Sequence, residues 1–163
     1  MNNNKLEIAT FAAGCFWGVQ ADFDKIPGVV STEAGYSGGN LPSGGENPNY
    51  EEVCTGKTGH AESVKVEYDS ALVSYEKLLE EFWKMHDPTT ADRQGPDVGS
   101  QYRSVIFYNT PEQKEAAEKS KEEKDASGIF DSPIVTQIVQ VTPFYRAEEY
   151  HQKYFEKTGR TVC

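Results

Sequence analysis

Cys15 is the residue of this sequence best placed for covalent chemistry, within the segment Gly14-Cys15-Phe16-Trp17-Gly18. We expect a strand to end just before it and a helix to begin at it. Backbone N–H groups and the helix dipole at a helix start favour a thiolate, which would lower the pKa of Cys15 and make it a nucleophile. A lone cysteine at such a junction is otherwise a small buried residue.

The neighbours of Cys15 favour chemistry over packing. Glycines flank the Cys-Phe-Trp triplet on both sides and leave space for a partner to approach. Trp17 lies about 100° around the expected helix from Phe16, off the apolar stripe that Phe16 begins. We therefore expect Phe16 to pack mainly in the core and Trp17 to form a small apolar pocket beside the thiolate.

Glu62 is an acid at the mouth of an apolar strand face. Side chains alternate between the two faces of a strand, so Glu62 shares a face with Val64 and Val66, whereas Lys65 and Glu67 lie on the other. Burial would raise the pKa of Glu62 and let it act as a general acid. A strand-end residue that turns outward to water fits the pattern equally well.

Two tyrosines and an aspartate lie in or beside loops. Tyr50 falls in a long loop expected over 37–59, and Tyr102 opens an expected strand after a second loop. Phenolic O–H groups can donate to a neutral but strongly polar acceptor, although ordinary packing is the simpler interpretation of either tyrosine. Asp97 follows Pro96 in a glycine-rich segment, where turn chemistry explains it.

Length and composition limit the possible classes. The 163 residues suggest a single domain over 1–163, and the net charge of −10 argues against unspecific nucleic-acid or anionic-membrane binding. The chain shows neither an apolar run of about 18 residues nor a signal peptide at its start, so we expect a cytoplasmic protein without a membrane partner. Three scattered cysteines exclude a disulfide framework, and no metal-ligand spacing is present.

The expected elements alternate as β-α-β-loop-β-α-loop-β-α-β-α. This order predicts an α+β two-layer sandwich, in which a mixed sheet with a ferredoxin-like core carries helices mainly on one face, together with long irregular loops and a C-terminal tail. We expect residues 158–163, which carry Cys163, to form a mobile tail. The strands are expected over 5–12, 29–36, 62–68, 102–108 and 134–141, and the helices over about 15–26, 75–86, 111–127 and 146–157.

Taken together and in chain order, several segments resemble the peptide methionine sulfoxide reductase A family. Each segment is weak alone, but the ordered set spans nearly the whole chain and is highly specific. The segments are GCFWG (14–18), GYSGG (35–39), NPNYEEVC (47–54), TGHAE (58–62), HDPTT (86–90), RQGPDVGSQYRS (93–104) and AEEYHQKY (147–154).

The resemblance implies an oxidoreductase that reduces the S epimer of methionine sulfoxide, free or in proteins, with no metal or cofactor. Thiolate attack would leave a sulfenic acid, which a second thiol resolves as a disulfide. The implied catalytic set is a nucleophile, a general acid, two hydroxyls for the sulfoxide oxygen and a supporting carboxylate: Cys15, Glu62, Tyr50, Tyr102 and Asp97.

The resemblance also implies a substrate-binding set and a reductant. Phe16 and Trp17 would form the wall for the S-methyl group, and Gly14 and His60 belong to the same binding segments. The usual reductant would be thioredoxin. Glutaredoxin or glutathione could instead recycle the enzyme directly, with no internal disulfide.

The resolving thiol is left open by the sequence. We favour Cys163, because a flexible glycine-containing tail could carry it to Cys15. Cys54 is the rival, and we interpret it rather as a buried loop residue. Two other functions compete with the reductase: a thiol peroxidase, which the apolar Phe16 and Trp17 disfavour, and a binding module for oxidised methionine. We expect a monomer.

Overall fold

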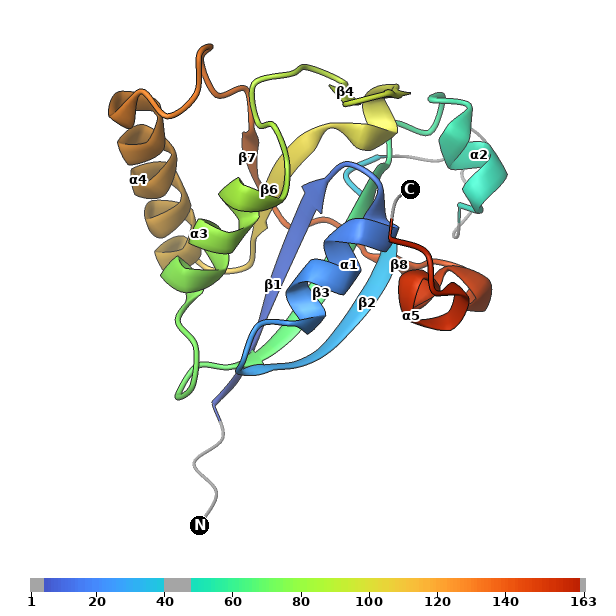
Figure 1. Cartoon of the computed structure of the whole chain (residues 1–163), viewed down its shortest axis with the longest axis horizontal. Helices are drawn as coiled ribbons and strands as arrows, with labels where there is room; N and C mark the ends of the chain where they lie inside the picture. The colour runs from blue at the N-terminus through green and yellow to red at the C-terminus, as the bar shows by residue number, and fades with distance from the viewer. Residues whose placement is uncertain (1–4, 40–47, 162–163) are drawn as a thin grey trace.

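A β-α-β-β-α-β unit forms the centre of the computed structural model, which describes residues 5–39 and 48–161 (Figure 1). Its strands lie in the order β6-β1-β3-β2, and each neighbouring pair is antiparallel. This is the split arrangement of a ferredoxin-like fold, so the predicted fold class is confirmed. The unit consists of β1 (Leu6–Ala13), α1 (Phe16–Asp24), β2 (Val29–Ser37), β3 (Ala61–Asp69), α3 (Tyr75–Met85) and β6 (Ser104–Tyr108).

Two further strands extend the sheet at its edges. β7 (Gln137–Gln140) pairs in parallel with β6, and β8 (Tyr145–Arg146) pairs antiparallel with β2. A parallel pair needs a long crossover connection, which helix α4 (Pro111–Ser127) provides. The sheet is therefore mixed, with six strands in the order β7-β6-β1-β3-β2-β8.

The core lies between one face of the sheet and helices α1 and α3. Phe11 of β1 stacks on Phe23 of α1 with ring centroids 5.0 Å apart, and it also contacts Phe82 of α3 at 5.3 Å. Both helices therefore cover the same face (Figure 1). The apolar stripe predicted for α1 is confirmed, because all of its members are buried: Phe16, Val19, Phe23 and Ile26.

The first long loop contains a helix that we did not predict. Helix α2 (Tyr50–Cys54) begins at Asn49, whose side chain accepts from Glu52 N–H at 2.8 Å. The Glu52 carboxylate accepts in return from Asn49 N–H at 3.4 Å, which completes a capping box. A helix of one turn shows no apolar period, so only its cap could have revealed it.

The second loop and the C-terminal segment also differ from expectation. The loop holds a small hairpin of β4 (Arg93–Gln94) and β5 (Asp97–Val98), and Tyr102 ends a 3₁₀ turn (Ser100–Tyr102) instead of opening a strand. The helix predicted over 146–157 is divided into β8, a 3₁₀ turn (Glu149–His151) and α5 (Tyr154–Thr158). Lys153, at φ 55°, breaks the helical path between the last two.

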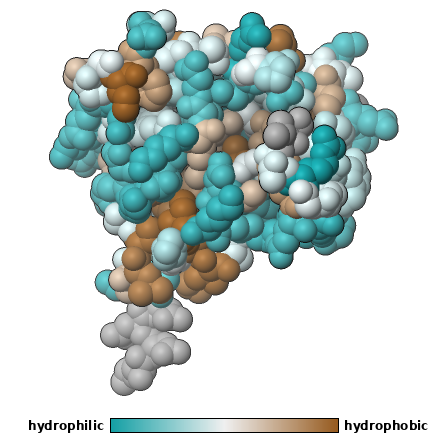
Figure 2. All heavy atoms as spheres, viewed as in Figure 1, coloured by the Kyte–Doolittle hydropathy of each residue, from teal (hydrophilic) through white to brown (hydrophobic). Residues whose placement is uncertain are grey.

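The surface is largely polar in the view of Figure 2, with apolar residues gathered mainly near the base, above the grey N-terminal atoms. In the described part of the chain, no helix combines the length and apolarity that crossing a membrane requires.

The structure describes residues 158–161 of the predicted tail, and Gly159 at φ 73° ends α5. The remainder of that tail, with Cys163, lies outside the described residues.

Gly14 makes the turn from β1 into α1. Its φ of 92° lies in the left-handed region, and a Cβ at this position would come within 2.8 Å of Gln94 Cγ. The β4–β5 hairpin therefore packs directly against the turn that carries Cys15. Only a glycine permits both the turn and this close approach.

We expect Gly14→Ala to destabilise the fold more than the matched control Gly95→Ala. Both positions have positive φ, which costs an L-residue about 1–2 kcal/mol, but no heavy atom lies within 4 Å of a Cβ at Gly95. The extra loss at Gly14 reports the displacement of Gln94. Urea unfolding of the two variants measures the difference, and equal losses would show that the hairpin does not press on the turn.

Candidate active site

Cys15 lies at the N-cap of α1, and its half-buried side chain adjoins a backbone group that binds an acid. The N–H of Phe16, the first residue of the helix, donates to Glu62 Oε1 at 3.2 Å. The Cys15 carbonyl accepts from Val19 N–H at 3.4 Å and starts the helical ladder. One hydrogen bond, between residues 46 apart in the sequence, thus brings the predicted acid beside the residue that follows the predicted nucleophile.

Glu62 lies on the buried face of β3, so the outward-turned alternative is wrong. Its side chain is 2% exposed, and Oε2 has no hydrogen-bond partner among the described residues. Burial raises the pKa of Glu62 to about 8. The hydrogen bond from Phe16 N–H lowers this pKa, and the charge of Asp97 raises it, but burial is the largest cause. The carboxyl group is therefore mostly neutral at pH 7, with a proton that it can donate.

Tyr50, Tyr102 and Asp97 come to Glu62 from three different elements. Tyr50 begins α2, Tyr102 ends the 3₁₀ turn, and Asp97 begins β5. Burial is the largest cause that raises the pKa of Tyr102 to about 12, and the charge of Glu62 adds to it. Burial and the same charge also raise the pKa of Tyr50. Both phenols therefore remain neutral O–H donors, half-buried beside the acid.

The aromatic part of the site joins α1 to the C-terminal segment. Phe16 is 1% exposed, as expected of a core residue, whereas Trp17 is half-buried. The indole Nε1–H of Trp17 donates to His151 Nδ1 at 2.9 Å, and the indole ring stacks on Tyr154 with centroids 3.8 Å apart. The ring of His151 in turn lies 4.5 Å from that of Tyr50. The C-terminal segment thus completes the site.

Sequence reasoning assigned no role to His151, Tyr154 or Glu148. The Glu148 carboxylate accepts from the Tyr36 hydroxyl at 3.0 Å and from Tyr50 N–H at 3.2 Å. These residues lie in the family-like segment 147–154, but its pattern suggests only a short helix. Their importance depends on contacts with residues about 100 positions away, which spacing along the chain cannot reveal.

Two other predicted residues lie differently from the rest. Cys54 ends α2 and is exposed, so its interpretation as a buried loop residue is wrong. Its thiol interacts with the Tyr50 side chain, and partial desolvation raises its pKa. His60 precedes β3 and is 2% exposed, with its ring edge-on to Tyr145 at 5.7 Å. The ring of His60 thus packs on β8.

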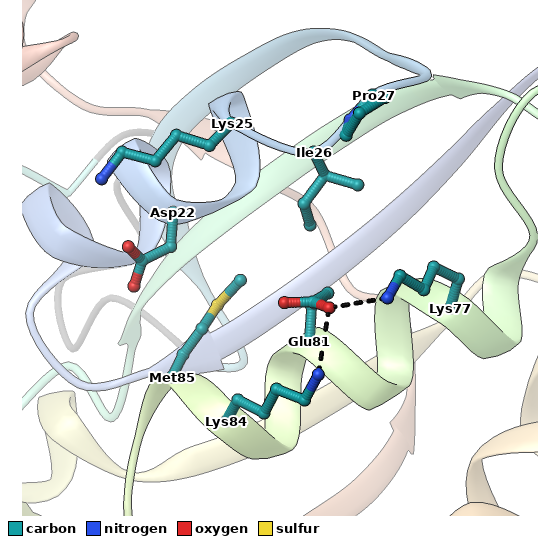
Figure 3. A pocket seen from close by; sticks show the side chains of 8 residues that line it. All are labelled: Asp22, Lys25, Ile26, Pro27, Lys77, Glu81, Lys84 and Met85. Carbon is teal, nitrogen blue, oxygen red and sulfur yellow. Dashed lines mark hydrogen bonds and ion pairs between the residues drawn. The ribbon is translucent and has the colours of Figure 1, made fainter.

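A groove between α1 and α3, of about 450 Å³, contains none of the predicted site residues (Figure 3). It lies at the opposite end of α1 from Cys15. Glu81 at its centre pairs with Lys77 at 2.9 Å and with Lys84 at 3.4 Å, so these charges largely satisfy one another. The groove offers no nucleophile, and we place the candidate chemistry at the Cys15 end.

A cysteine at a helix start, next to the residue that binds a buried neutral acid, defines the site of a cysteine-dependent oxidoreductase. A family model described as peptide methionine sulfoxide reductase matches residues 7–163. The chain is also 62% identical over 154 residues to the peptide methionine sulfoxide reductase MsrA of Methanosarcina acetivorans, covering 94% of this chain and 80% of that protein. The chain belongs to the peptide methionine sulfoxide reductase family, and the predicted family and enzyme class are confirmed.

Solved structures agree with this assignment. The crystal structure of reduced Mxr1 from Saccharomyces cerevisiae matches with a TM-score of 0.90 at 35% identity, covering 98% of this chain and 89% of that one. Mxr1 has also been solved in complex with Trx2, where the match has a TM-score of 0.64 at 26% identity and covers 92% of this chain and 85% of that one. The likeness therefore extends over the whole α+β fold.

The raised pKa of Glu62 predicts a pH-dependent cost to stability. Between the ordinary carboxyl pKa of 4.5 and about 8, the folded state keeps a proton that the unfolded chain has released, so stability falls as pH rises. We expect the unfolding free energy of the wild type to fall relative to that of Glu62→Gln, by at most ~1.4 kcal/mol per pH unit. Urea unfolding at several pH values measures this difference, and a constant difference across the window would contradict the burial argument.

Proposed function

We propose that the chain reduces the S epimer of methionine sulfoxide, free and in proteins, with Cys15 as nucleophile and Glu62 as general acid. The observation that carries this proposal is the hydrogen bond from Phe16 N–H to Glu62 Oε1, at 3.2 Å. It fixes a neutral carboxyl group one residue from the nucleophile. A base at that position could not protonate the departing oxygen, whereas a buried acid with a pKa of about 8 can.

The chemistry begins with the polar S–O bond. Glu62 and the phenols of Tyr50 and Tyr102 donate hydrogen bonds to the sulfoxide oxygen, which makes the sulfur electrophilic. The Cys15 thiolate attacks that sulfur and forms a bond to it, while the oxygen takes the Glu62 proton and becomes a hydroxyl. The hydroxyl then passes from the substrate sulfur to the Cys15 sulfur, so that an S–O bond to Cys15 forms as the substrate S–O bond and the bond between the two sulfurs break. Methionine leaves and Cys15 is a sulfenic acid, so the substrate is reduced by two electrons and Cys15 is oxidised by two.

Substrate selection follows from the apolar side of the site. Phe16 and Trp17 form the wall for the S-methyl group, opposite the O–H donors that hold the oxygen. A chiral sulfoxide can place its methyl group on the wall and its oxygen at Glu62 in only one hand, which selects one epimer. Asp97 supports this site from β5, and Gly14 makes the tight turn that presents Cys15. His60 contributes indirectly, because it lies two residues before Glu62, just ahead of β3.

Recycling requires a second thiol, which attacks the sulfenic acid and releases water as a disulfide forms. We assign this role to Cys163, because the raised pKa of Cys54 makes its thiol a poor source of thiolate. A reduced thioredoxin then restores both thiols, and the complex of the family member Mxr1 with Trx2 supports this choice. Glutaredoxin or glutathione is the alternative donor.

The predicted cytoplasmic location and monomeric state stay predictions.

We expect Glu62→Gln to lower kcat/KM for the S sulfoxide by about 10²–10⁴-fold, because one general acid contributes that much. Cys15→Ser should abolish reduction. Glu67→Gln is the matched control, since Glu67 lies on the same strand with its side chain on the other face. The assay is single-turnover release of methionine from each epimer. Wild-type turnover by Glu62→Gln would exclude the acid role.

The wild-type rate should also fall as pH rises above about 8, because Glu62 then loses the proton that it must donate. Glu62→Gln has no proton to lose and should lack this decline. Measuring kcat/KM from pH 6 to about 10 in both proteins tests whether Glu62 causes the decline at high pH. A decline that persists in Glu62→Gln would assign it to another group.

Mass spectrometry after one turnover identifies the resolving route. We expect a disulfide between Cys15 and Cys163 in the wild type and in Cys54→Ser. In Cys163→Ser we expect a persistent sulfenic acid, or a glutathione adduct when glutathione is present. A disulfide between Cys15 and Cys54 in the wild type would refute our assignment.

A further inference from the structure

We propose that His151 is a positioning residue that fixes the indole of Trp17, and thereby the apolar wall of the site, by accepting the indole N–H at Nδ1. The proposal rests on the proposed function and extends it by one residue. It is carried by the bond from Trp17 Nε1 to His151 Nδ1, at 2.9 Å, which joins α1 to the C-terminal segment.

The imidazole of His151 is held in a single orientation. It is 1% exposed and surrounded by aromatic rings at centroid distances of 5.1 Å for Phe16, 4.5 Å for Tyr50 and 4.0 Å for Tyr150. These rings come from three different segments of the chain. Rotation of the imidazole would require all three to move, so its ring nitrogens have fixed directions.

The bond determines which nitrogen of His151 carries the proton. An indole N–H only donates, so Nδ1 must be unprotonated to accept it. In the neutral imidazole the proton then resides on Nε2, which lies 4.0 Å from Glu148 Oε2. Nε2 makes no hydrogen bond to the described residues, so the carboxylate is the group that faces it. Burial lowers the pKa of His151 while Glu148 opposes that change, and burial is the larger cause.

The same carboxylate connects the wall to the oxygen side of the site. Glu148 Oε2 accepts from Tyr50 N–H at 3.2 Å, and Oε1 accepts from the Tyr36 hydroxyl at 3.0 Å. Glu148 therefore holds the start of α2, which carries a phenol donor, and also faces the histidine that holds Trp17. The spacing between the S-methyl wall and this donor is thus set by one short segment.

Without the bond to His151, the orientation of the Trp17 indole would depend mainly on stacking. Its face stacks on Tyr154, with centroids 3.8 Å apart and an angle of 15° between the planes, but stacking allows the ring to slide and turn in its own plane. The bond to His151 removes that freedom. Loss of the acceptor would leave a partly buried N–H unpaired, and the indole would turn away to satisfy it.

A pair of variants separates the acceptor from the packing of the ring. His151→Asn keeps a polar atom close to the position of Nδ1 but loses ring volume, whereas His151→Phe keeps a ring of similar size without an acceptor. We expect His151→Phe to raise KM for methionine sulfoxide by about tenfold, the worth of one such hydrogen bond, with kcat within about twofold. His151→Asn should stay within about threefold of the wild type in both parameters.

Selectivity offers a second kinetic readout. The wild type should prefer the S-methyl substrate over its S-ethyl analogue, because a wall held in place has room for a methyl group but not for an ethyl group. We expect His151→Phe to reduce this preference and His151→Asn to keep it. A purely structural defect would lower activity on both substrates alike. A raised KM and lost preference in His151→Asn, with His151→Phe unaffected, would overturn the proposal in favour of ring packing.

The indole N–H can also be observed without any turnover. In protein labelled with ¹⁵N-tryptophan, Trp17 and Trp83 give the two indole signals of the chain, and Trp83→Phe assigns them. Trp83 donates to Ser120 Oγ at 2.8 Å and serves as the internal reference. The N–H of Trp17 should lose its exchange protection in His151→Phe and keep it in His151→Asn. Protection retained in His151→Phe would refute the proposal.

The kinetic measurements and the indole exchange together distinguish failure of the positioning role of His151 from failure of the proposed function. A wild-type protein that reduced no sulfoxide would refute the function. The indole signals would still decide whether His151 holds Trp17. Normal reduction with unchanged KM, selectivity and exchange in His151→Phe would refute the positioning role and leave the function intact.

Discussion

The site depends on one hydrogen bond between a helix start and a buried carboxyl group. The first N–H groups of a helix have no partner within the helix, and Glu62 Oε1 provides one for Phe16. That N–H and the helix dipole favour the charged carboxylate, while burial favours the neutral acid, and burial dominates because the pKa reaches about 8. The result is an acid that keeps its proton at neutral pH and is nevertheless held in one orientation beside Cys15.

The ferredoxin-like order of strands makes this bond possible. β1 and β3 are antiparallel neighbours, with Phe11 opposite Val64, so the chain leaves β1 close to where β3 begins. Cys15 follows the end of the first strand and Glu62 lies at the start of the other, on the face that α1 covers. Gly14 turns the chain between them. The proposed nucleophile and acid are thus positioned by the sheet itself, and the loops add the proposed donors.

Sequence reasoning succeeded where a residue's placement depends on local periodicity. The alternation around Val64 and Val66 indicated that Glu62 could face inward, and the helical stripe separated Phe16 from Trp17. It failed where structure depends on caps and distant partners. The capping box of Asn49 starts a helix too short to show a period, and the single helix predicted over 146–157 is divided into shorter elements. Family-like segments identified which regions meet, but not how.

The C-terminal segment is held at the site by buried amides as well as by aromatic contacts. Gln152 accepts from Ala34 N–H and donates to Ala34 C=O, both at 2.9 Å, and so occupies hydrogen-bonding groups of β2 much as a neighbouring strand would. Gln20 of α1 accepts from Lys153 N–H at 2.9 Å on the other side. Because an unpaired buried amide is costly, these bonds specify one docked arrangement. A segment made only of short elements is thereby held in one place, and so is the indole that bonds to it.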